Sequence, residues 1–258
     1  MITVLSPAKK LSKECSALDL KKSECDFLDE SLSLAKILKG FESEDLQKLM
    51  GISKKLSQLN VERFQKWSLP FKDSSARQAI FSFMGDTYTG VDASTLSLED
   101  IKFAQENIRI LSGLYGLLRP MDLIMPYRLE MGTKLKTDRG NHLHDFWKSL
   151  ITKALDDELE NHKNDIIVNC ASVEYFNAID TASLRAKVVT PLFKEYRDGK
   201  PKIISFFAKR ARGSMARYIV NNRISDIDGI LSFDYDGYSY NSQLSKEFEP
   251  VFTRKSQK

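Results

Sequence analysis

The spacing of apolar residues divides the chain into a mainly helical first half and a second half that carries most of the predicted strands. Apolar positions recur at helical spacing over residues 28–40, 43–56, 60–66, 74–84, 98–111, 141–161 and 208–222. Short runs rich in Ile, Val and Phe predict strands at residues 2–5, 165–170, 187–193, 202–207 and 230–240. The sequence has no linker or repeat, so we expect one compact α+β domain, a mixed α/β unit over residues 1–258. A long crossover must then return strand 2–5 to the sheet of the second half.

Composition narrows the class of protein. The chain has 258 residues and is 42% hydrophobic, which is enough to bury a large core. The sequence contains no apolar run of about 18 residues, and its first residues are too few and too polar for a signal peptide. The three cysteines, Cys15, Cys25 and Cys170, show no CxxC spacing. We therefore expect a reduced, cytoplasmic protein without disulfides or contact with a membrane.

Positive charge is concentrated in one segment. The net charge of the whole chain is +4. The segment from Lys194 to Arg223 contains nine basic residues and two acidic ones, Glu195 and Asp198, so its own net charge is +7. The nine are Lys194, Arg197, Lys200, Lys202, Lys209, Arg210, Arg212, Arg217 and Arg223. A local excess of this kind favours a polyanionic partner, and a merely solvated face is the alternative.

The predicted helix over 208–222 places this charge on one face. At about 100° per residue, Lys209, Arg210, Arg212, Arg217 and Arg223 fall within an arc of roughly 160°. Gly213 and Ala216 lie on the same face, where small side chains would let a nucleic-acid backbone approach, although Gly costs about 1 kcal/mol relative to Ala in a helix. The alternative is that these arginines pair with acids elsewhere in the fold.

Two glycines three residues apart follow the predicted helix 98–111. Gly113 and Gly116 in "LSGLYG", with Arg119 and Arg128 beyond them, predict a helix-hairpin-helix-like element over about 98–126. Backbone N–H groups of such a hairpin bind phosphate. The spacing is Gly-x-x-Gly rather than Gly-x-Gly, and prolines restrict the second helix to a short piece. The alternative is a helix cap and a turn, with the Leu and Tyr between the glycines in the core.

Three polar stretches could form a pocket where strands end. They are "LSPAKK" at 5–10, "GDTYTG" at 85–90 and "NCASVEYF" at 169–176, and they supply Ser6, Lys9, Asp86, Tyr88, Asn169, Ser172, Glu174 and Tyr175. If strands 2–5 and 165–170 are neighbours, Lys9, Asn169, Ser172 and Glu174 converge at the carboxyl ends. Asp86 and Glu174 are then candidates for acid–base chemistry or for binding a hard cation. Turn capping and tyrosine packing are the alternatives.

Metal binding has weaker support. In "HLHD", which supplies His142, His144 and Asp145, the two histidines are two positions apart, so they would face each other on an extended segment but not on a helix. We interpret the stretch as a helix start with surface histidines. We therefore assign no metal and no cofactor, and rank direct iron binding last.

Several motifs together resemble the YaaA peroxide stress protein family. They are SPAK at 6–9, GDTYTG at 85–90, LSGLYGLLRPMDL at 111–123, PYRLEMG at 126–132 and ISFFAKRARG at 204–213. "NCASVEYF" is similar to the strand-turn of that family, with Cys170 in place of Leu. The resemblance implies a bacterial cytoplasmic protein that responds to hydrogen peroxide, limits oxidative damage and lowers unincorporated iron. It also implies a helix-hairpin-helix element and a positively charged cleft that binds double-stranded DNA.

Residue by residue, the resemblance places Gly113, Gly116, Arg119 and Arg128 in the hairpin region, and Lys209, Arg210 and Arg212 in the cleft. With Lys9 and Arg217 added, we predict a monomer that binds the backbone of duplex DNA, with strong salt dependence and a preference for distorted DNA. The second hypothesis is an enzyme acting on DNA or a nucleotide. Glu174 or Asp86 would be its base or metal ligand, and Tyr88 or Tyr175 would stack on a nucleobase.

Overall fold

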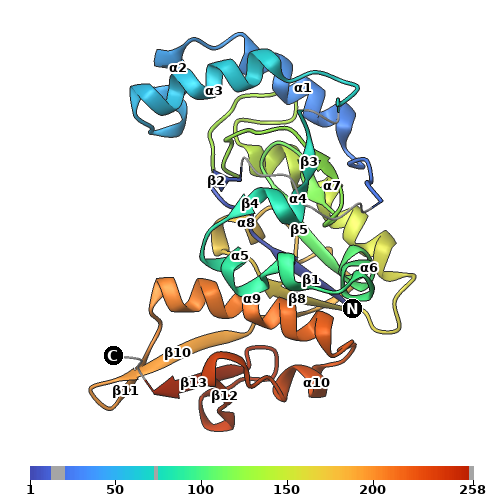
Figure 1. Ribbon diagram of the computed structural model, residues 1–258, viewed down its shortest axis with the longest axis vertical. Coiled ribbons are helices and arrows are strands. Elements are labelled where there is room, and N and C mark those ends of the chain that lie inside the picture. The colour runs from blue at the N-terminus through green and yellow to red at the C-terminus, as the bar shows by residue number, and fades with distance from the viewer. Residues whose placement is uncertain (13–20, 73–74, 256–258) are drawn as a thin grey trace.

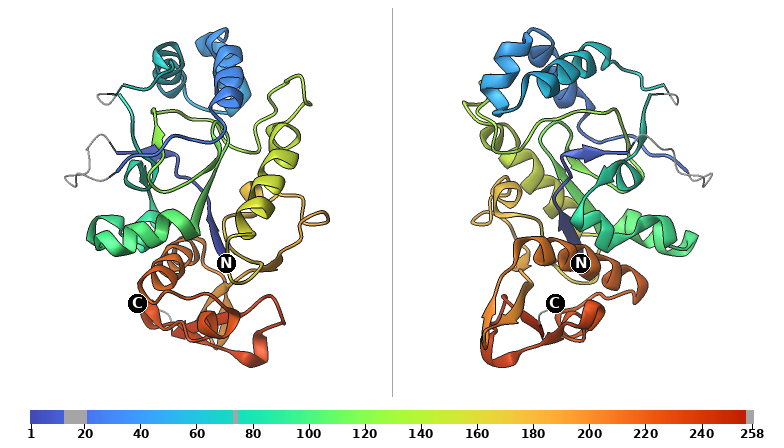
Figure 2. Two further views of the ribbon diagram at one scale, coloured as in Figure 1. Left: turned by 90° about the vertical axis from the view of Figure 1, so that its right-hand side faces the viewer. Right: turned by 60° about the vertical axis from the view of Figure 1, so that its left-hand side comes forward.

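Figure 1 shows the computed structural model of the chain, which describes residues 1–12, 21–72 and 75–255. Cys15 and the first residue of the predicted helix 74–84 lie outside the described residues. The protein is a single domain of mixed α and β structure, as expected. Both views in Figure 2 place the helices within residues 28–66 at one end of the molecule and residues 205–255 at the opposite end.

A five-stranded sheet forms the centre of the molecule, in the order β6-β5-β1-β8-β9. Its strands are β1 (Ile2–Leu5), β5 (Ile108–Ser112), β6 (Gly116–Leu118), β8 (Ile166–Cys170) and β9 (Lys187–Val189). β1 pairs in parallel with β5 on one side and with β8 on the other, so the long crossover is confirmed. Every residue of β1, β5 and β8 is buried, as expected for parallel strands covered on both faces.

The four-stranded sheet comes entirely from the second half, in the order β11-β10-β13-β12. Its strands are β10 (Leu192–Arg197), β11 (Lys200–Lys202), β12 (Ser239–Tyr240) and β13 (Val251–Lys255). Phe193 stacks on Phe252 across this sheet, and a buried ion pair joins Glu195 to Arg254 at 2.5 Å. Two small antiparallel pairs are β2 (Lys10–Leu11) with β4 (Phe83–Met84), and β3 (Arg77–Gln78) with β7 (Leu123–Ile124).

Helices cover these sheets. In chain order they are α1 (Leu28–Lys39), α2 (Ser43–Met50), α3 (Lys54–Lys66), α4 (Ala79–Ser82), α5 (Asp86–Val91), α6 (Leu98–Asn107), α7 (Leu143–Leu159), α8 (Val173–Phe176), α9 (Ser205–Asn221) and α10 (Ile227–Leu231). Single turns of 3₁₀ helix occur at Ala93–Thr95, Tyr235–Gly237 and Ser242–Leu244. α9 lies between the two larger sheets and contacts β1, β8 and β10 (Figure 1).

Two glycines bring α5 and α9 into backbone contact. A Cβ atom on Gly213 would lie 1.8 Å from the carbonyl oxygen of Thr87, and one on Gly90 would lie 2.2 Å from that of Arg210. No side chain fits at either distance, so both positions require glycine. Ala216 is also buried. The expectation that Gly213 and Ala216 admit a nucleic-acid backbone was therefore wrong, because α5 occupies that face.

The predicted helix-hairpin-helix element is not present. α6 ends at Asn107, and the next residues form β5, which turns back as the antiparallel strand β6. Gly113 and Gly116 belong to this β-hairpin rather than to a turn between helices. The apolar run that was predicted as the end of a helix is a buried strand. Periodicity alone does not distinguish a short buried strand from a buried helix.

Other element boundaries moved for local reasons. The predicted helix 43–56 divides at Gly51, whose φ of 61° ends α2 in the left-handed region. α9 begins at Ser205 and so replaces the second half of the predicted strand 202–207. Of the predicted strand 230–240, only Ser239–Tyr240 is a strand, as β12, because the end of α10 and a 3₁₀ turn take five of the other positions. The predicted helix 74–84 retains only the short α4. Helices predicted at 28–40 and 141–161 are confirmed as α1 and α7.

None of the helices in the described ranges is both long and apolar enough to span a membrane.

Candidate functional site

The carboxyl ends of β1 and β8 lie side by side because the two strands are parallel neighbours. The backbone N–H of Ser172 donates to Ser6 Oγ at 2.8 Å, and Ser6 Oγ donates to Ser172 Oγ at 3.2 Å. The Tyr88 hydroxyl, which projects from α5, donates to the carbonyl oxygen of Ser6 at 3.0 Å. Three of the candidate pocket residues therefore meet at one place.

A loop between β7 and α7 adds charged groups to these strand ends. Lys9 Nζ lies 2.7 Å from Glu130 Oε2, and Arg128 NH2 donates to Glu130 Oε1 at 2.9 Å. The backbone N–H of Gly132 donates to Glu174 Oε1 at 3.1 Å. We call the combined group, Ser6, Lys9, Tyr88, Arg128, Glu130, Ser172, Glu174 and Tyr175, the strand-end cluster.

Tyr88 and Tyr175 are buried, with 7% and 8% of their surface exposed. Burial raises the pKa of both phenols well above the ordinary value, so both remain neutral hydrogen-bond donors. Because their ring faces are covered, they do not support the expectation that they stack on a nucleobase.

Asn169 shapes the turn after β8. Its Oδ1 accepts from the backbone N–H of Ala171 at 3.1 Å, and its Nδ2 donates to Thr190 Oγ1 at 3.4 Å. The amide is therefore satisfied within the fold. Asp86 is the first residue of α5, and among the residues that the structure describes no hydrogen bond or ion pair ties it to the strand-end cluster.

Arg212 reaches the end of β8 from α9. Its NH1 donates to the carbonyl oxygen of Ala171 at 2.8 Å, while its buried Nε has no partner. Burial lowers the pKa of this guanidinium, and no carboxylate in the described residues forms an ion pair with it. Arg212 is thus a largely buried cation whose charge is not neutralised by the fold.

Arg119 and Arg217, by contrast, serve the fold itself. Arg119 lies 2.8 Å from Asp26 and 3.2 Å from Asp122, and it donates to the carbonyl oxygen of Glu24 at 2.6 Å. Arg217 donates to the carbonyl oxygens of Val91 and Asp92 at the end of α5. Neither side chain is free to bind DNA as predicted, because each is held by partners within the fold.

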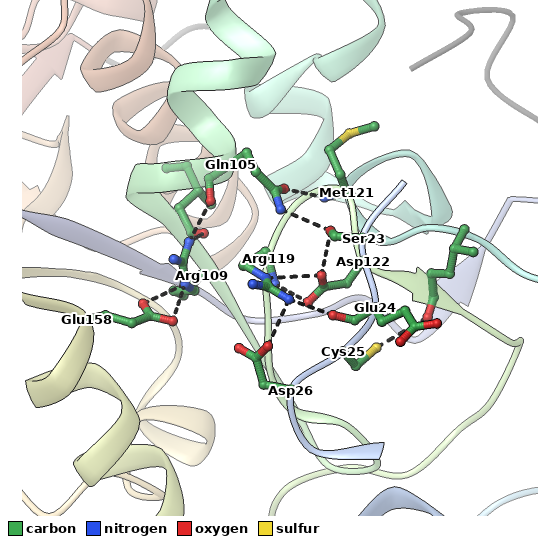
Figure 3. A network of polar contacts seen from close by, with 12 residues as sticks. Ser23, Glu24, Cys25, Asp26, Gln105, Arg109, Arg119, Met121, Asp122 and Glu158 are labelled. Atoms are coloured by element: carbon green, nitrogen blue, oxygen red, sulfur yellow. Dashed lines mark hydrogen bonds and ion pairs between the residues drawn. The ribbon is translucent and has the colours of Figure 1, made fainter. Parts of the chain in front are cut away.

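Figure 3 shows the network around Arg119. Ser23 and Gln105 continue it on one side, and Arg109, 2.7 Å from Glu158, lies on the other. We call Ser23, Asp26, Gln105, Arg109, Arg119, Asp122 and Glu158 the amino-end network, because it surrounds the amino end of β5. Each of its two arginines has at least one carboxylate partner.

Gly113 and Gly116 are required for packing. A Cβ on Gly113 would lie 2.3 Å from the carbonyl oxygen of Leu129, and one on Gly116 would lie 2.5 Å from the ring of Trp147. Gly116 also has a φ of +68°, which glycine adopts readily. Both glycines are enclosed, so they do not expose N–H groups to a phosphate as predicted. Instead, Gly113 lets the loop that carries Arg128 and Glu130 pass close to β5.

Exposed cations gather on a different element. Arg197, Lys200 and Lys202 lie on the β10–β11 hairpin and Lys209 on the first turns of α9, with the exposed Ile203 (57%) and Phe206 (54%) between them. We call these six residues the basic arm, which lies at the lower left of Figure 1. Its apolar members were missed because residues 202–207 were interpreted as a strand. Arg210, also exposed, lies 3.8 Å from Asp236.

The described cysteines are poor candidates for chemistry with peroxide. Cys25 and Cys170 are both buried, and burial raises the pKa of each thiol, that of Cys170 to about 12. Since the thiolate is the reactive form, neither side chain is activated. Within the described ranges, no group of three or more His, Cys, Asp or Glu side chains is arranged to hold a metal ion.

His142 and His144 lie at the start of α7, as predicted. His142 is the N-cap residue, and His144 Nε2 is 2.8 Å from the carbonyl oxygen of Glu174.

The fold and the site define a single-domain mixed α/β protein with a cationic site at the ends of parallel strands. The sequence profile of the family described as "Peroxide stress protein YaaA" matches residues 1–244, and the chain belongs to this family. It is 48% identical over 255 residues to a UPF0246 protein of Saccharophagus degradans, covering 99% of this chain and 100% of that protein. A UPF0246 protein of Colwellia psychrerythraea is 49% identical, covering 99% of each chain. One from Aliivibrio fischeri is 48% identical, covering 100% of this chain and 99% of the relative.

Proposed function

We propose that this peroxide stress protein limits oxidative damage by binding the backbone of double-stranded DNA through the basic arm. Family membership supports the role in peroxide stress. The lowering of intracellular free iron, which the resemblance implies, belongs to the same proposal as an indirect effect, since the described residues hold no cluster of metal ligands.

The observation that carries the DNA proposal is the unneutralised charge of the basic arm. Arg197, Lys200 and Lys209 form no ion pair with any residue that the structure describes, and Lys202 has only the exposed Asp198 at 3.8 Å. An exposed pair at this distance contributes roughly 0–1 kcal/mol, so the Lys202 ammonium remains available. Lysines and arginines on one projecting element are typical of contacts to phosphates.

The apolar side chains of the basic arm sharpen the prediction. Ile203 and Phe206 are large and exposed among cations, where a purely electrostatic surface needs neither. Apolar side chains that insert between base steps bind bent or unstacked DNA better than regular duplex. We therefore expect bulged DNA to bind more tightly than the matched duplex.

The test is fluorescence anisotropy of duplex, single-stranded and bulged DNA at several salt concentrations. Replacing Lys200 and Lys202 together by Ala should weaken binding for all sequences and lower the salt slope by about 2. A matched control is the pair Lys54→Ala and Lys55→Ala, two exposed lysines of α3 at the other end of the molecule. Equal affinities for the two double variants and the unmodified protein would contradict the proposal.

An enzyme acting on DNA or a nucleotide is the second candidate, favoured by the position of Glu174 at the strand ends. If this is correct, the same titrations yield product on prolonged incubation, and Glu174→Gln abolishes turnover while binding persists. Turnover that survives this substitution would remove Glu174 from the mechanism.

A further inference from the structure

We propose that the strand-end cluster, together with Arg63 and Arg212, binds a small molecule that carries a phosphate monoester. This site is separate from the basic arm, and the inference does not rest on DNA binding. Three features support it: the balance of charge, the unused donors of two arginines, and the position at the ends of adjacent parallel strands.

The charges at this site do not balance. Lys9 and Arg128 both contact the carboxylate of Glu130, and Glu174 accepts from a backbone N–H rather than from a cation. Arg212 joins them at Ala171, next to Ser172, and Arg63 lies near enough to Arg128 for the charge of Arg128 to lower its pKa. The site thus combines four cationic side chains with two carboxylates. The fold therefore gathers positive charge that its own acids do not neutralise. A bound dianion would neutralise this excess, and the cost of the partly buried cations would then fall.

Arg128 is positioned but not saturated. Its side chain is 17% exposed, and NH2 donates to Glu130, but the buried Nε has no hydrogen-bond partner. A buried donor without a partner costs free energy unless a ligand or water accepts from it. Glu130, held by Lys9 and Arg128 together, fixes the orientation of both cations. An arginine held in this way offers the planar donor pair that suits phosphate oxygens.

Arg63 and Arg212 add two further cations to the site. The pKa of Arg63 is lowered by burial and then by the charge of Arg128, so these two guanidinium groups lie close enough to repel. The Nε of Arg212 is buried without a partner, as in Arg128. Like charges held together in a folded protein are typical of a site whose counter-ion is the ligand.

The location also fits a ligand site. Ligands of sheet proteins bind beyond the carboxyl ends of strands, and here β1 and β8 end together. The hydroxyl groups of Ser6 and Ser172 lie at these ends and can donate to phosphate oxygens. Lys9 is 64% exposed, so the cluster is open to solvent and accessible to a small molecule.

The excess of two positive charges favours a dianion over a monoanion. A phosphate monoester carries nearly two negative charges at neutral pH, because its second pKa is about 6. The diester of a DNA backbone carries one. We therefore expect a nucleoside monophosphate and inorganic phosphate to bind more tightly than dimethyl phosphate. Dimethyl phosphate is a diester and represents the linkage of the DNA backbone.

Isothermal titration calorimetry with these three probes tests the inference. Arg128→Met should weaken the binding of the nucleoside monophosphate at least tenfold, and Arg63→Met should weaken it as well. The control is Arg185→Met, an exposed arginine that pairs with Asp156 and Glu160 at the surface. Circular dichroism and urea unfolding establish whether each variant is folded. If Arg128→Met does not fold, Arg63→Met provides the test instead.

The outcomes separate this proposal from DNA binding. We expect the Lys200→Ala, Lys202→Ala double variant to bind the nucleoside monophosphate like the unmodified protein, although its affinity for DNA falls. No binding of either monoester, or equal binding by Arg128→Met, Arg63→Met and Arg185→Met, would overturn the proposal whatever the result with DNA. Tighter binding of dimethyl phosphate than of both monoesters would also overturn it, since the site would then recognise a backbone diester.

Discussion

The two ends of the central sheet use the same kinds of residue in different proportions. In the amino-end network, Arg109 and Arg119 meet the carboxylates of Glu158, Asp26 and Asp122 (Figure 3). The strand-end cluster and the neighbouring Arg63 and Arg212 together hold four cationic side chains against two carboxylates, and the buried Nε donors of Arg128 and Arg212 lack partners. The difference indicates that arginines in this chain are structural where acids match them and available for a ligand where acids are too few.

The largest effect is expected from removing a carboxylate of the amino-end network. Asp122 has no exposed surface and accepts from Ser23, from the backbone N–H of Arg119 and from its side chain. Asp122→Ala should lower the free energy of unfolding by about 3 kcal/mol, because it leaves the buried donors around it without an acceptor and removes one of the two carboxylates that pair with Arg119. Urea unfolding measures this, with the exposed Asp138→Ala as the control. Phosphate binding should survive in the folded fraction, and its loss would show that the two ends are coupled.

A smaller effect is expected at the turn that supports the strand-end cluster. Gly113→Ala should lower the free energy of unfolding by about 2 kcal/mol, because its Cβ would overlap the backbone of Leu129. Affinity for the nucleoside monophosphate should also fall, since the same loop carries Arg128 and Glu130. Gly40→Ala is the control, with ordinary helical φ and its nearest contact at 3.4 Å. Unchanged stability would mean that the loop can shift freely.

A third prediction concerns pH and the amino end. Burial, with nearby positive charge that includes Arg109, lowers the pKa of His162 from 6.5 to about 4. As the pH falls, His162 therefore binds a proton in the unfolded chain before it does so in the folded chain. The contribution of neutral His162 to the free energy of unfolding is complete above pH 6.5. It is lost as the pH falls toward 4. Between pH 7 and pH 5 we expect a loss of about 1 kcal/mol, reduced by solvent screening because the side chain is half-buried.

His162→Gln should remove this part of the pH dependence, as measured by urea unfolding at pH 7 and pH 5. An identical loss in the variant and in the unmodified protein would assign the effect to other groups.

The smallest effect is expected on the basic arm. Replacing Lys200 and Lys202 by Ala should change the free energy of unfolding by less than about 0.5 kcal/mol, because both side chains are exposed. The same urea unfolding experiment measures it. A loss above 1 kcal/mol would place these lysines among the structural cations and weaken the DNA proposal.

The sequence predicted correctly what depends on neighbouring residues. The helical spacing over 28–40 and 141–161 identified α1 and α7. The condition set for a pocket, that strands 2–5 and 165–170 are neighbours, is met, and Ser6 contacts Ser172 there. In each case the evidence lay in one short stretch or in the topology of parallel strands.

The failures share a different physical cause. Arg119 is neutralised in part by Asp26, Arg217 is bound by the end of α5, and Gly213 is occluded by Thr87. Each partner lies about ninety or more positions away in the chain, so no local pattern reveals it. The helix predicted over residues 108–111 was wrong for a related reason. These residues belong to β5, and a fully buried strand has no polar face to distinguish it from a buried helix.

The central position of β1 also has a consequence for the chain during its synthesis. The two edges of β1 pair with strands that begin at Ile108 and Ile166, so an apolar segment leaves the ribosome long before either partner exists. At about 5–20 residues per second, the delay before β8 is made is roughly 10–30 s. During that interval Ile2–Leu5 has both edges unpaired and depends on the nascent chain or on a chaperone to stay out of aggregates.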